Sequence, residues 1–183
     1  MQKISMDLDN TIFNVAEKYR AVVESHNYKY TPPISYDVYK NSYPKHIADA
    51  LKQMLFSDEI YKTNVFDPKI PEILNTIYNN PKYMLYYITE RPNGDDWAQL
   101  NRAGIICDRA RVINYTPKIQ ALKQCCIDLC FDDSPSVVAD CLENNIDVVM
   151  ISNPDTAYNH HLRGRVEYYP DLVTALIQRN IIK

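Results

Sequence analysis

The sequence predicts an α/β fold built around a mainly parallel sheet. Five short apolar segments have the composition of strands, and most of the segments between them have helical periodicity. Alternation of this kind favours parallel strands joined by helices that cover both faces of the sheet. Several expected strands end in an acid or a hydroxyl, and open α/β sheets bind ligands at the carboxyl ends of their strands. The sequence therefore predicts a ligand site at the carboxyl edge of the sheet.

The expected strands and helices follow one another along the chain with recognisable start and stop signals. Gly104 is the expected end of a helix over about 95 to 103, and Asn144 is the expected end of one over about 135 to 143. Pro170 begins the last helix. The expected strands span roughly 3–7, 83–88, 110–114, 128–132 and 147–151.

A long interval after the first strand interrupts this alternation. It shows helical periodicity without a convincing strand, which predicts a small helical cap inserted between strands one and two. Pro32-Pro33 breaks the insert internally, and Pro71 lies where the chain returns to the core. The returning segment has a face suited to packing on the sheet, formed by Ile70, Ile73, Leu74 and Ile77. The expected boundaries are 1–13 and 81–183 for the core and 14–80 for the cap, which returns to the core at about 67–80.

The first strand is expected to end in two carboxylates two residues apart. Asp7 and Asp9 follow the apolar run that begins at Ile4, and Thr11 completes a DxDxT pattern. Side chains two apart in a strand share a face. A metal therefore has room between the Asp7 carboxylate and the backbone or side chain of Asp9.

Later polar groups occupy equivalent positions in the predicted fold. The second strand ends at Thr89, and the fourth ends at the pair Asp132 and Asp133. Lys118 lies in the first turn of a helix, with Thr116 as the expected N-cap and Pro117 as the first helical residue. The order along the chain is DxDxT, Thr, Lys, DD.

This ordered set resembles the haloacid dehalogenase-like (HAD) phosphohydrolase superfamily, from residue 4 to about the strand after Asp133. The resemblance implies a Rossmann-like core and a Mg²⁺-dependent phosphatase. The family's dehalogenase and phosphonatase branches lack an acid at the second position, so Asp9 indicates phosphate ester hydrolysis. The implied roles are nucleophile for Asp7, general acid/base for Asp9, phosphate binding for Thr89 and Lys118, and metal binding for Asp7, Asp9, Asp132 and Asp133.

The chemistry of phosphate esters favours the same assignment on independent grounds. A carboxylate attacks a negatively charged ester only if cations neutralise the repulsion, which Mg²⁺ and an ammonium group do. Attack by Asp7 gives an aspartyl-phosphate, and Asp9 is placed to protonate the leaving oxygen and later to deprotonate water. Oxygen-only ligands favour Mg²⁺ over zinc. The spacing leaves open whether Asp132 or Asp133 is the direct ligand, and the resemblance favours Asp133, because family members with an adjacent acid pair often use the second.

Other interpretations of these acids fit less well. An EF-hand loop beginning at Asp7 would need glycine where Ile12 stands and glutamate where Lys18 stands. A receiver domain has its acid pair first and its phosphorylated aspartate on a later strand, which is the reverse of the order here. A HAD-shaped protein that binds a phosphorylated ligand without turning it over stays an alternative, although no member of the motif set is missing.

The expected substrate is a small phosphorylated molecule, because a cap at this position closes over the phosphate site and excludes water. The cap and the segments DLDNT and FDDSP resemble the 5'(3')-deoxyribonucleotidase branch, which implies a (deoxy)nucleoside monophosphate. Asn10 and Arg91 are expected to bind substrate beside Thr89 and Lys118. The alternatives are a polynucleotide 3'-phosphatase and a sugar-phosphate phosphatase on the same scaffold. Tyrosines in the insert can stack on a nucleobase or serve packing alone, and they include Tyr28, Tyr30, Tyr36, Tyr39, Tyr43 and Tyr61.

Composition fits a single globular enzyme. A chain of 183 residues with 46% hydrophobic content can bury a sizeable core. The net charge of -3 argues against binding nucleic acid through bulk electrostatics. No segment has a signal-peptide pattern or the length of a membrane span, so a cytoplasmic location without a membrane partner is expected. The five cysteines form no CxxC pair and are expected to be buried reduced thiols. A homodimer is left open.

Overall fold

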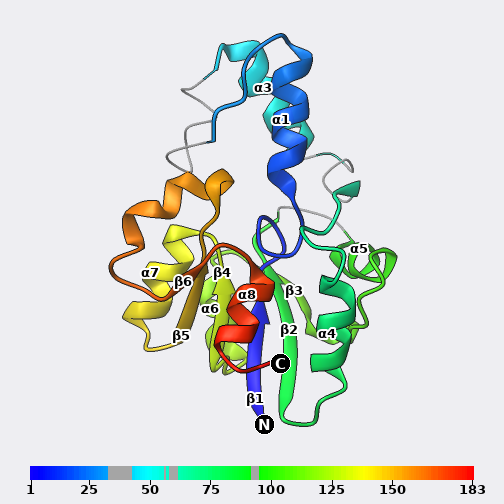
Figure 1. Ribbon diagram of the computed structural model, residues 1–183, viewed down its shortest axis with the longest axis vertical. Coiled ribbons are helices and arrows are strands. Elements are labelled where there is room, and N and C mark those ends of the chain that lie inside the picture. The colour runs from blue at the N-terminus through cyan, green and yellow to red at the C-terminus, as the bar shows by residue number, and fades with distance from the viewer. Residues whose placement is uncertain (33–42, 56, 58–61, 92–94) are drawn as a thin grey trace.

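A six-stranded sheet forms the centre of the molecule (Figure 1). Its order is β3-β2-β1-β4-β5-β6, and every neighbouring pair is parallel, which confirms the expected α/β, Rossmann-like fold. The computed structural model describes residues 1–32, 43–55, 57, 62–91 and 95–183. The strands are β1 (Gln2–Met6), β2 (Tyr83–Thr89), β3 (Val112–Asn114), β4 (Leu129–Asp132), β5 (Asp147–Ile151) and β6 (Tyr168–Tyr169).

Helices cover both faces of the sheet, because alternate strand residues point to opposite sides. Ile4 and Met6 of β1 join a buried cluster with residues of α4, α5 and α8. Cys130 of β4 and Met150 of β5 join a second cluster with residues of α6 and α7. The helices are α4 (Ile70–Tyr78), α5 (Asp96–Arg102), α6 (Lys118–Gln124), α7 (Pro135–Glu143) and α8 (Leu172–Gln178).

Over its described residues, the insert contains helices joined by turns and irregular segments, and its only β-contact is an isolated bridge between Phe13 and Val65. Helices α1 (Val15–Ser25) and α3 (Lys45–Leu55) contact each other and stand beyond the carboxyl ends of the strands (Figure 1). Helix α4 then returns and packs on β2 through buried residues that the sequence predicted. Part of the sequence interpretation concerns residues that lie outside the described ranges, namely Pro33, Tyr36, Tyr39 and Tyr61.

The expected helix ends are confirmed at two positions. Gly104 follows α5 with φ +79°, a backbone angle that glycine adopts without strain, and α7 ends with Asn144 as its C-cap. The last helix, however, begins at Leu172 rather than at Pro170. Asp171 is its N-cap, because the aspartate side chain accepts a hydrogen bond from the Thr174 N–H at 2.7 Å.

Two strand predictions were incomplete. The third strand is shorter than expected, because 109–111 form the 3₁₀ turn η2 and the Asp108 side chain accepts from the Ala110 N–H at 3.0 Å. Strand β6 escaped prediction because two residues are too few to show alternation. It pairs with the end of β5, Ile151 lying opposite Tyr169.

The cysteines are all free, but they do not share one environment. Cys130 and Cys141 are buried, as expected. Cys126 is exposed, because it lies in the turn after α6 with φ +52°, so the expectation of burial is wrong for this residue. Among the described helices, none has both the length and the apolar character needed to cross a membrane.

Candidate active site

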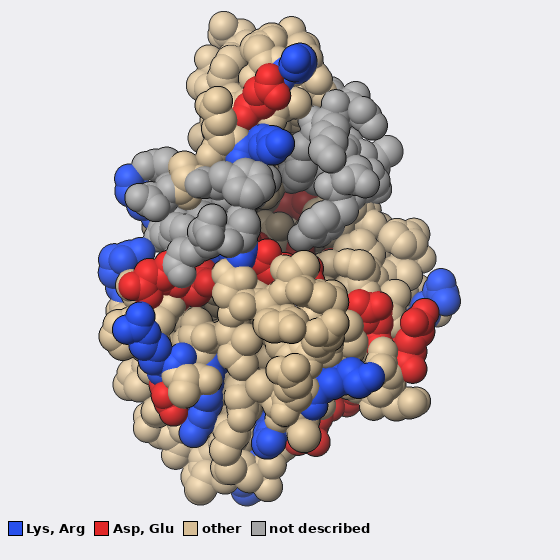
Figure 2. Space-filling view, turned by 180° about the vertical axis from the view of Figure 1, so that it is seen from behind, with Lys and Arg blue, Asp and Glu red and all other residues tan. Residues whose placement is uncertain are grey.

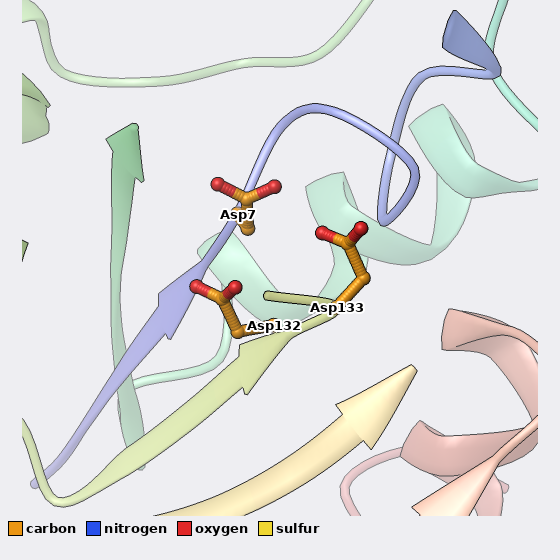
Figure 3. Close-up of side chains that lie close together, drawn as sticks. All are labelled: Asp7, Asp132 and Asp133. Atoms are coloured by element: carbon orange, nitrogen blue, oxygen red, sulfur yellow. The ribbon is translucent and has the colours of Figure 1, made fainter. Parts of the chain in front are cut away.

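Three carboxylates meet at the carboxyl edge of the sheet. Asp7 directly follows β1, Asp132 is the last residue of β4, and Asp133 comes next. In the pairing of these strands Met6 lies opposite Phe131, and the Asp7 N–H donates to the Phe131 carbonyl at 3.0 Å. Each carboxylate offers an oxygen within 4.8 Å of the others, and all three residues are buried. Figure 3 shows the side chains beside one another at the ends of the two strands.

Lys118 supplies a cation to two of these carboxylates. Its Nζ donates to Asp7 Oδ1 and to Asp132 Oδ2, the latter at 2.7 Å. Asp132 Oδ1 also accepts from the Ser134 N–H at 2.9 Å, so both of its oxygens are bonded. The Lys118 side chain is 3% exposed, and charges buried this deeply are stable only when paired.

Helix α6, which positions Lys118, starts one residue later than the sequence indicated. Pro117 is the N-cap, with an extended backbone (φ −75°, ψ 139°), and Lys118 is the first helical residue. The prediction of Thr116 as N-cap is therefore wrong. A carboxylate from the segment after β2 takes that place, because Glu90 Oε1 accepts from the Lys118 N–H at 2.7 Å. Negative charge at a helix N-terminus is favourable.

Burial dominates the electrostatics of the carboxylates. It raises the pKa of Asp7 from 3.8 to about 7, against the effect of the Lys118 ammonium and with a contribution from Asp132. Burial, together with the charges of Asp7 and Asp132, also raises the pKa of Asp133 well above its usual value. For Lys118, burial disfavours the charged form, but Asp132 and Asp7 outweigh it and raise the pKa. The cluster thus holds more acid than its own cation can neutralise.

Asp133 is fixed by residues outside the motif set. The Tyr158 hydroxyl donates to Asp133 Oδ2, and Asn159 Nδ2 donates to the Asp133 carbonyl at 2.7 Å. Both residues come from the 3₁₀ segment η3 (Pro154–Leu162). Asn10, in the loop after β1, donates from Nδ2 to the Tyr158 hydroxyl at 3.2 Å. Tyr158 therefore links the loop that follows Asp7 to the end of β4.

Asp9 lies apart from the three clustered carboxylates and pairs with Arg91. Arg91 Nε donates to both Asp9 oxygens at 3.1 Å, and Nη2 donates to Oδ1. Arg91 Nη1 donates to Asp96 Oδ1 at 2.9 Å and to Gln99 Oε1 at 2.5 Å. The Arg91 side chain is only 2% exposed, whereas that of Asp9 is 28% exposed.

Thr89 ends β2 on the same edge of the sheet. Strand β2 pairs with β1, so Thr89 lies two residues beyond Tyr87, the partner of Met6. Its side chain is buried, and its Oγ1 accepts from the Arg91 N–H at 3.4 Å. The structure therefore brings Asp7, Asp132, Asp133 and Lys118 into contact, and it places Asp9, Asn10, Thr89 and Arg91 in the strand-end loops beside them.

The sequence interpretation missed five residues of this site. Their side chains are bonded to the predicted ones, but their sequence context gave no distinguishing signal. Tyr158 is one of 15 tyrosines, and the partner of each missed residue lies on another element or across a turn. The missed residues are Glu90, Asp96, Gln99, Tyr158 and Asn159.

The clustered carboxylates have the properties of a divalent cation site. Three hard oxygen donors lie within reach of one ion, and Lys118 leaves two negative charges in excess when all three are ionised. The donor set contains no sulfur or imidazole, which favours Mg²⁺ over zinc. Figure 2 shows acidic surface in the band where the insert meets the core.

The fold matches solved structures of haloacid dehalogenase-like hydrolases. One such family protein from Streptococcus pneumoniae gives a TM-score of 0.64 at 15% identity, over 97% of this chain and 98% of that one. A protein assigned as a phosphoglycolate phosphatase from Lactobacillus plantarum gives 0.55 at 13%, over 96% and 98%. A β-phosphoglucomutase from Clostridium difficile gives 0.51 at 12%, over 98% and 96%. No protein-family model matches the chain, and no curated protein is significantly similar in sequence. The chain thus has the α/β fold of HAD hydrolases.

Proposed function

We propose that this protein is a Mg²⁺-dependent phosphomonoester hydrolase that works through an aspartyl-phosphate. The observation that carries the proposal is the contact of the buried Asp7 carboxylate with the Lys118 ammonium, beside the acid pair Asp132 and Asp133. A nucleophilic carboxylate needs this surrounding, because cations must offset the repulsion between it and a phosphate. The similarity to HAD hydrolases supports the same reaction class.

In the first step, an Asp7 oxygen bonds to phosphorus while the bond from phosphorus to the ester oxygen breaks. Asp9 gives the leaving oxygen a proton. Lys118 stabilises the charge on the transferring phosphoryl group, and Thr89 and Asn10 bind its oxygens. The product is an alcohol and phosphorylated Asp7.

In the second step, water attacks the phosphorylated side chain. Asp9 takes a proton from that water as the new oxygen to phosphorus bond forms and the bond to Asp7 breaks. Inorganic phosphate leaves, and both aspartates return to their starting state. Asp7, Asp9, and Asp132 or Asp133 are the residues that would hold Mg²⁺, and the ion would supply neutralising charge for the phosphate.

We further propose that residues 14–80 form a cap over this site, with residues 1–13 and 81–183 as the core. Two observations support a cap that meets the core at the site. Helices α1 and α3 stand beyond the carboxyl ends of the strands (Figure 1). Arg20 of α1 also pairs with Asp155 of η3 at 3.2 Å, which ties the insert to the segment that carries Tyr158. A cap excludes water while the aspartyl-phosphate exists.

For the substrate, we propose a small phosphorylated molecule, with a (deoxy)nucleoside monophosphate as the first candidate. Its support is the resemblance of the DLDNT and FDDSP segments to the 5'(3')-deoxyribonucleotidase branch. A sugar phosphate is the second candidate, favoured by the similarity to a protein described as a β-phosphoglucomutase. A polynucleotide 3'-phosphate is a third substrate that the same scaffold can serve. The cytoplasmic location and the homodimer stay predictions.

A substrate panel tests the proposal. We expect phosphate release from deoxynucleoside monophosphates, with Mg²⁺ present, to exceed release from sugar phosphates and from 3'-phosphorylated oligonucleotides. Preference for a sugar phosphate would replace the first candidate and keep the reaction class. Binding without turnover of any ester would instead establish the non-catalytic alternative.

A further inference from the structure

The two carboxylate oxygens of Asp9 accept different numbers of hydrogen bonds from Arg91. Among the hydrogen bonds of the described residues, Oδ1 accepts from both Nε and Nη2, whereas Oδ2 accepts from Nε alone, at 3.1 Å and shared with Oδ1. An arginine has donors only, so every contact it makes uses an acceptor site on the carboxylate. Oδ2 is therefore the oxygen with the greater capacity to carry or accept a proton. The Asp9 side chain is 28% exposed, so this carboxylate is not closed off from solvent.

Arg91 is itself anchored from the side opposite Asp9. Asp96 and Gln99 lie in the first turn of α5, and both are buried. They accept from the same guanidinium nitrogen, Nη1, and thereby fix the plane of the group. Helix α5 is in turn capped by Asp95, whose side chain accepts from the Ala98 N–H at 3.0 Å. The guanidinium thus joins a helix to the loop after β1.

The contacts also argue against a direct role of Arg91 at the phosphate. Each of its three side-chain nitrogens donates to an acceptor of this chain, and the side chain is 2% exposed. To bind a substrate phosphate bidentately, the guanidinium would have to release Asp9 or Asp96. Both are ionisable partners in a buried network, where a charge left without a partner is strongly disfavoured.

We propose that Arg91 is a positioning residue that orients Asp9 for proton transfer, with Oδ2 as the atom that carries the proton. This inference rests on the proposed phosphatase function. In the first step the proton moves from Oδ2 to the ester oxygen as its bond to phosphorus breaks and Asp7 bonds to phosphorus. In the second step Oδ2 takes a proton from the attacking water as that water bonds to phosphorus and Asp7 is released.

A double-mutant cycle separates this role from direct substrate binding. The variants are Asp9→Asn, Arg91→Met and their combination, and kcat/KM is measured for an alkyl phosphate and for p-nitrophenyl phosphate. We expect Arg91→Met to lower kcat/KM by about 100-fold for the alkyl ester, which needs a proton on its leaving oxygen. The loss for p-nitrophenyl phosphate should stay below about 10-fold, because p-nitrophenolate leaves without a proton. In the Asp9→Asn background, Arg91→Met should lower kcat/KM by less than about 3-fold.

Two further variants control for folding and for loss of a paired arginine. Arg91→Lys keeps a positive charge but lacks the forked donors of a guanidinium. Its kcat/KM should lie between the values for wild type and Arg91→Met. If Arg91→Met does not fold, Arg91→Lys replaces it in the double-mutant cycle. Arg179→Met removes an arginine paired with Asp147 and Glu167 away from the site and should leave kcat/KM unchanged for both esters.

The outcomes distinguish this inference from the proposed function. Equal losses for the two esters, or a loss by Arg91→Met that persists in full in the Asp9→Asn background, would overturn the positioning role and leave the phosphatase intact. Direct phosphate binding by Arg91 would give that second pattern. A wild-type protein that hydrolyses no phosphate ester would overturn the proposed function, and this inference with it.

Discussion

The site contains two buried cations, each set between two carboxylates, and they are arranged differently. Lys118 joins Asp7 and Asp132, with Asp133 close by as a third acid. Arg91 joins Asp9 and Asp96, and it also donates to the neutral Gln99.

The difference lies in charge and geometry. An ammonium is a point charge on a flexible stem, and in the Lys118 cluster it leaves an excess of acid that a divalent ion can neutralise. A guanidinium is a planar fork, and in the Arg91 cluster it fixes the orientation of its partners. The Lys118 cluster is therefore suited to binding a further cation, and the Arg91 cluster is suited to holding the Asp9 side chain in place.

The largest effect is expected for Asp7→Asn, which removes the proposed nucleophile from the Lys118 cluster. The amide is nearly isosteric but cannot attack phosphorus, so turnover should fall by at least about 10⁴-fold while the fold persists. Phosphate release and circular dichroism measure the two properties. Asp49→Asn, at an exposed position on α3, should keep full activity. Retention of ligand-dependent function by Asp7→Asn would support the non-catalytic alternative.

Lys118→Met tests whether the ammonium is required to keep the acids together. It leaves two buried carboxylates without their partner, and loss of one member of a buried ion pair typically costs about 3–5 kcal/mol. Denaturant unfolding should show this loss without metal, and Mg²⁺ should restore part of it. Lys123→Met, an exposed position on the same helix, should change stability by less than about 0.5 kcal/mol. Similar results for the two variants would show that the cluster tolerates its own charge.

Asp132 and Asp133 differ in their partners, which allows the metal ligand to be identified. Asp132 is held by Lys118 and by the Ser134 N–H, whereas Asp133 contacts the Tyr158 hydroxyl and no cation through the hydrogen bonds described. We expect Asp133→Asn to raise the Mg²⁺ concentration for half-maximal activity by at least about 10-fold. Asp132→Asn should change it less. The opposite order would assign Asp132 as the ligand.

The smallest expected effect is the pH dependence of stability without metal. Because burial raises the folded-state pKa of Asp7 to about 7, the folded protein keeps a proton that the unfolded chain loses near pH 4. Stability should therefore fall as the pH rises from about 4 to 7, by about 2–4 °C in Tm per pH unit. Thermal melts should show that Tm changes less steeply with pH for Asp7→Asn, and for wild type with Mg²⁺. A wild-type stability that rises over this range without metal would contradict the burial of Asp7 as described.

Local patterns were sufficient to predict most of the fold. Helix α7 was placed correctly because Pro135 marks its start and Asn144 its end, and the apolar run before Asp132 marked β4. The acid pair, Thr89 and Lys118 could be assigned to strand ends and a helix start for the same reason. Prediction failed where a residue from another element makes the deciding contact. Thr116 carries a typical N-cap side chain, yet Glu90 from another element caps the helix.

The remaining parts of the site depend on contacts between distant segments. The Asp9 to Arg91 pair spans 82 positions and the Asp133 to Tyr158 pair spans 25, so no local spacing relates them. The sequence predicted an acid/base role for Asp9 and a metal-binding role for Asp133. What orients each of them became visible only once β1, β2, β4 and η3 were placed side by side.

Three consecutive residues at the end of β2 contribute to three different parts of the site. Thr89 ends β2 at the carboxyl edge of the sheet, Glu90 caps the helix of Lys118, and Arg91 donates to Asp9. A deletion of one residue here would displace all three side chains at once, so the contacts made to Lys118 and to Asp9 would be lost together. Insertions and deletions that evolution accepts in this chain should therefore fall outside this tripeptide, whose length is as constrained as its chemistry.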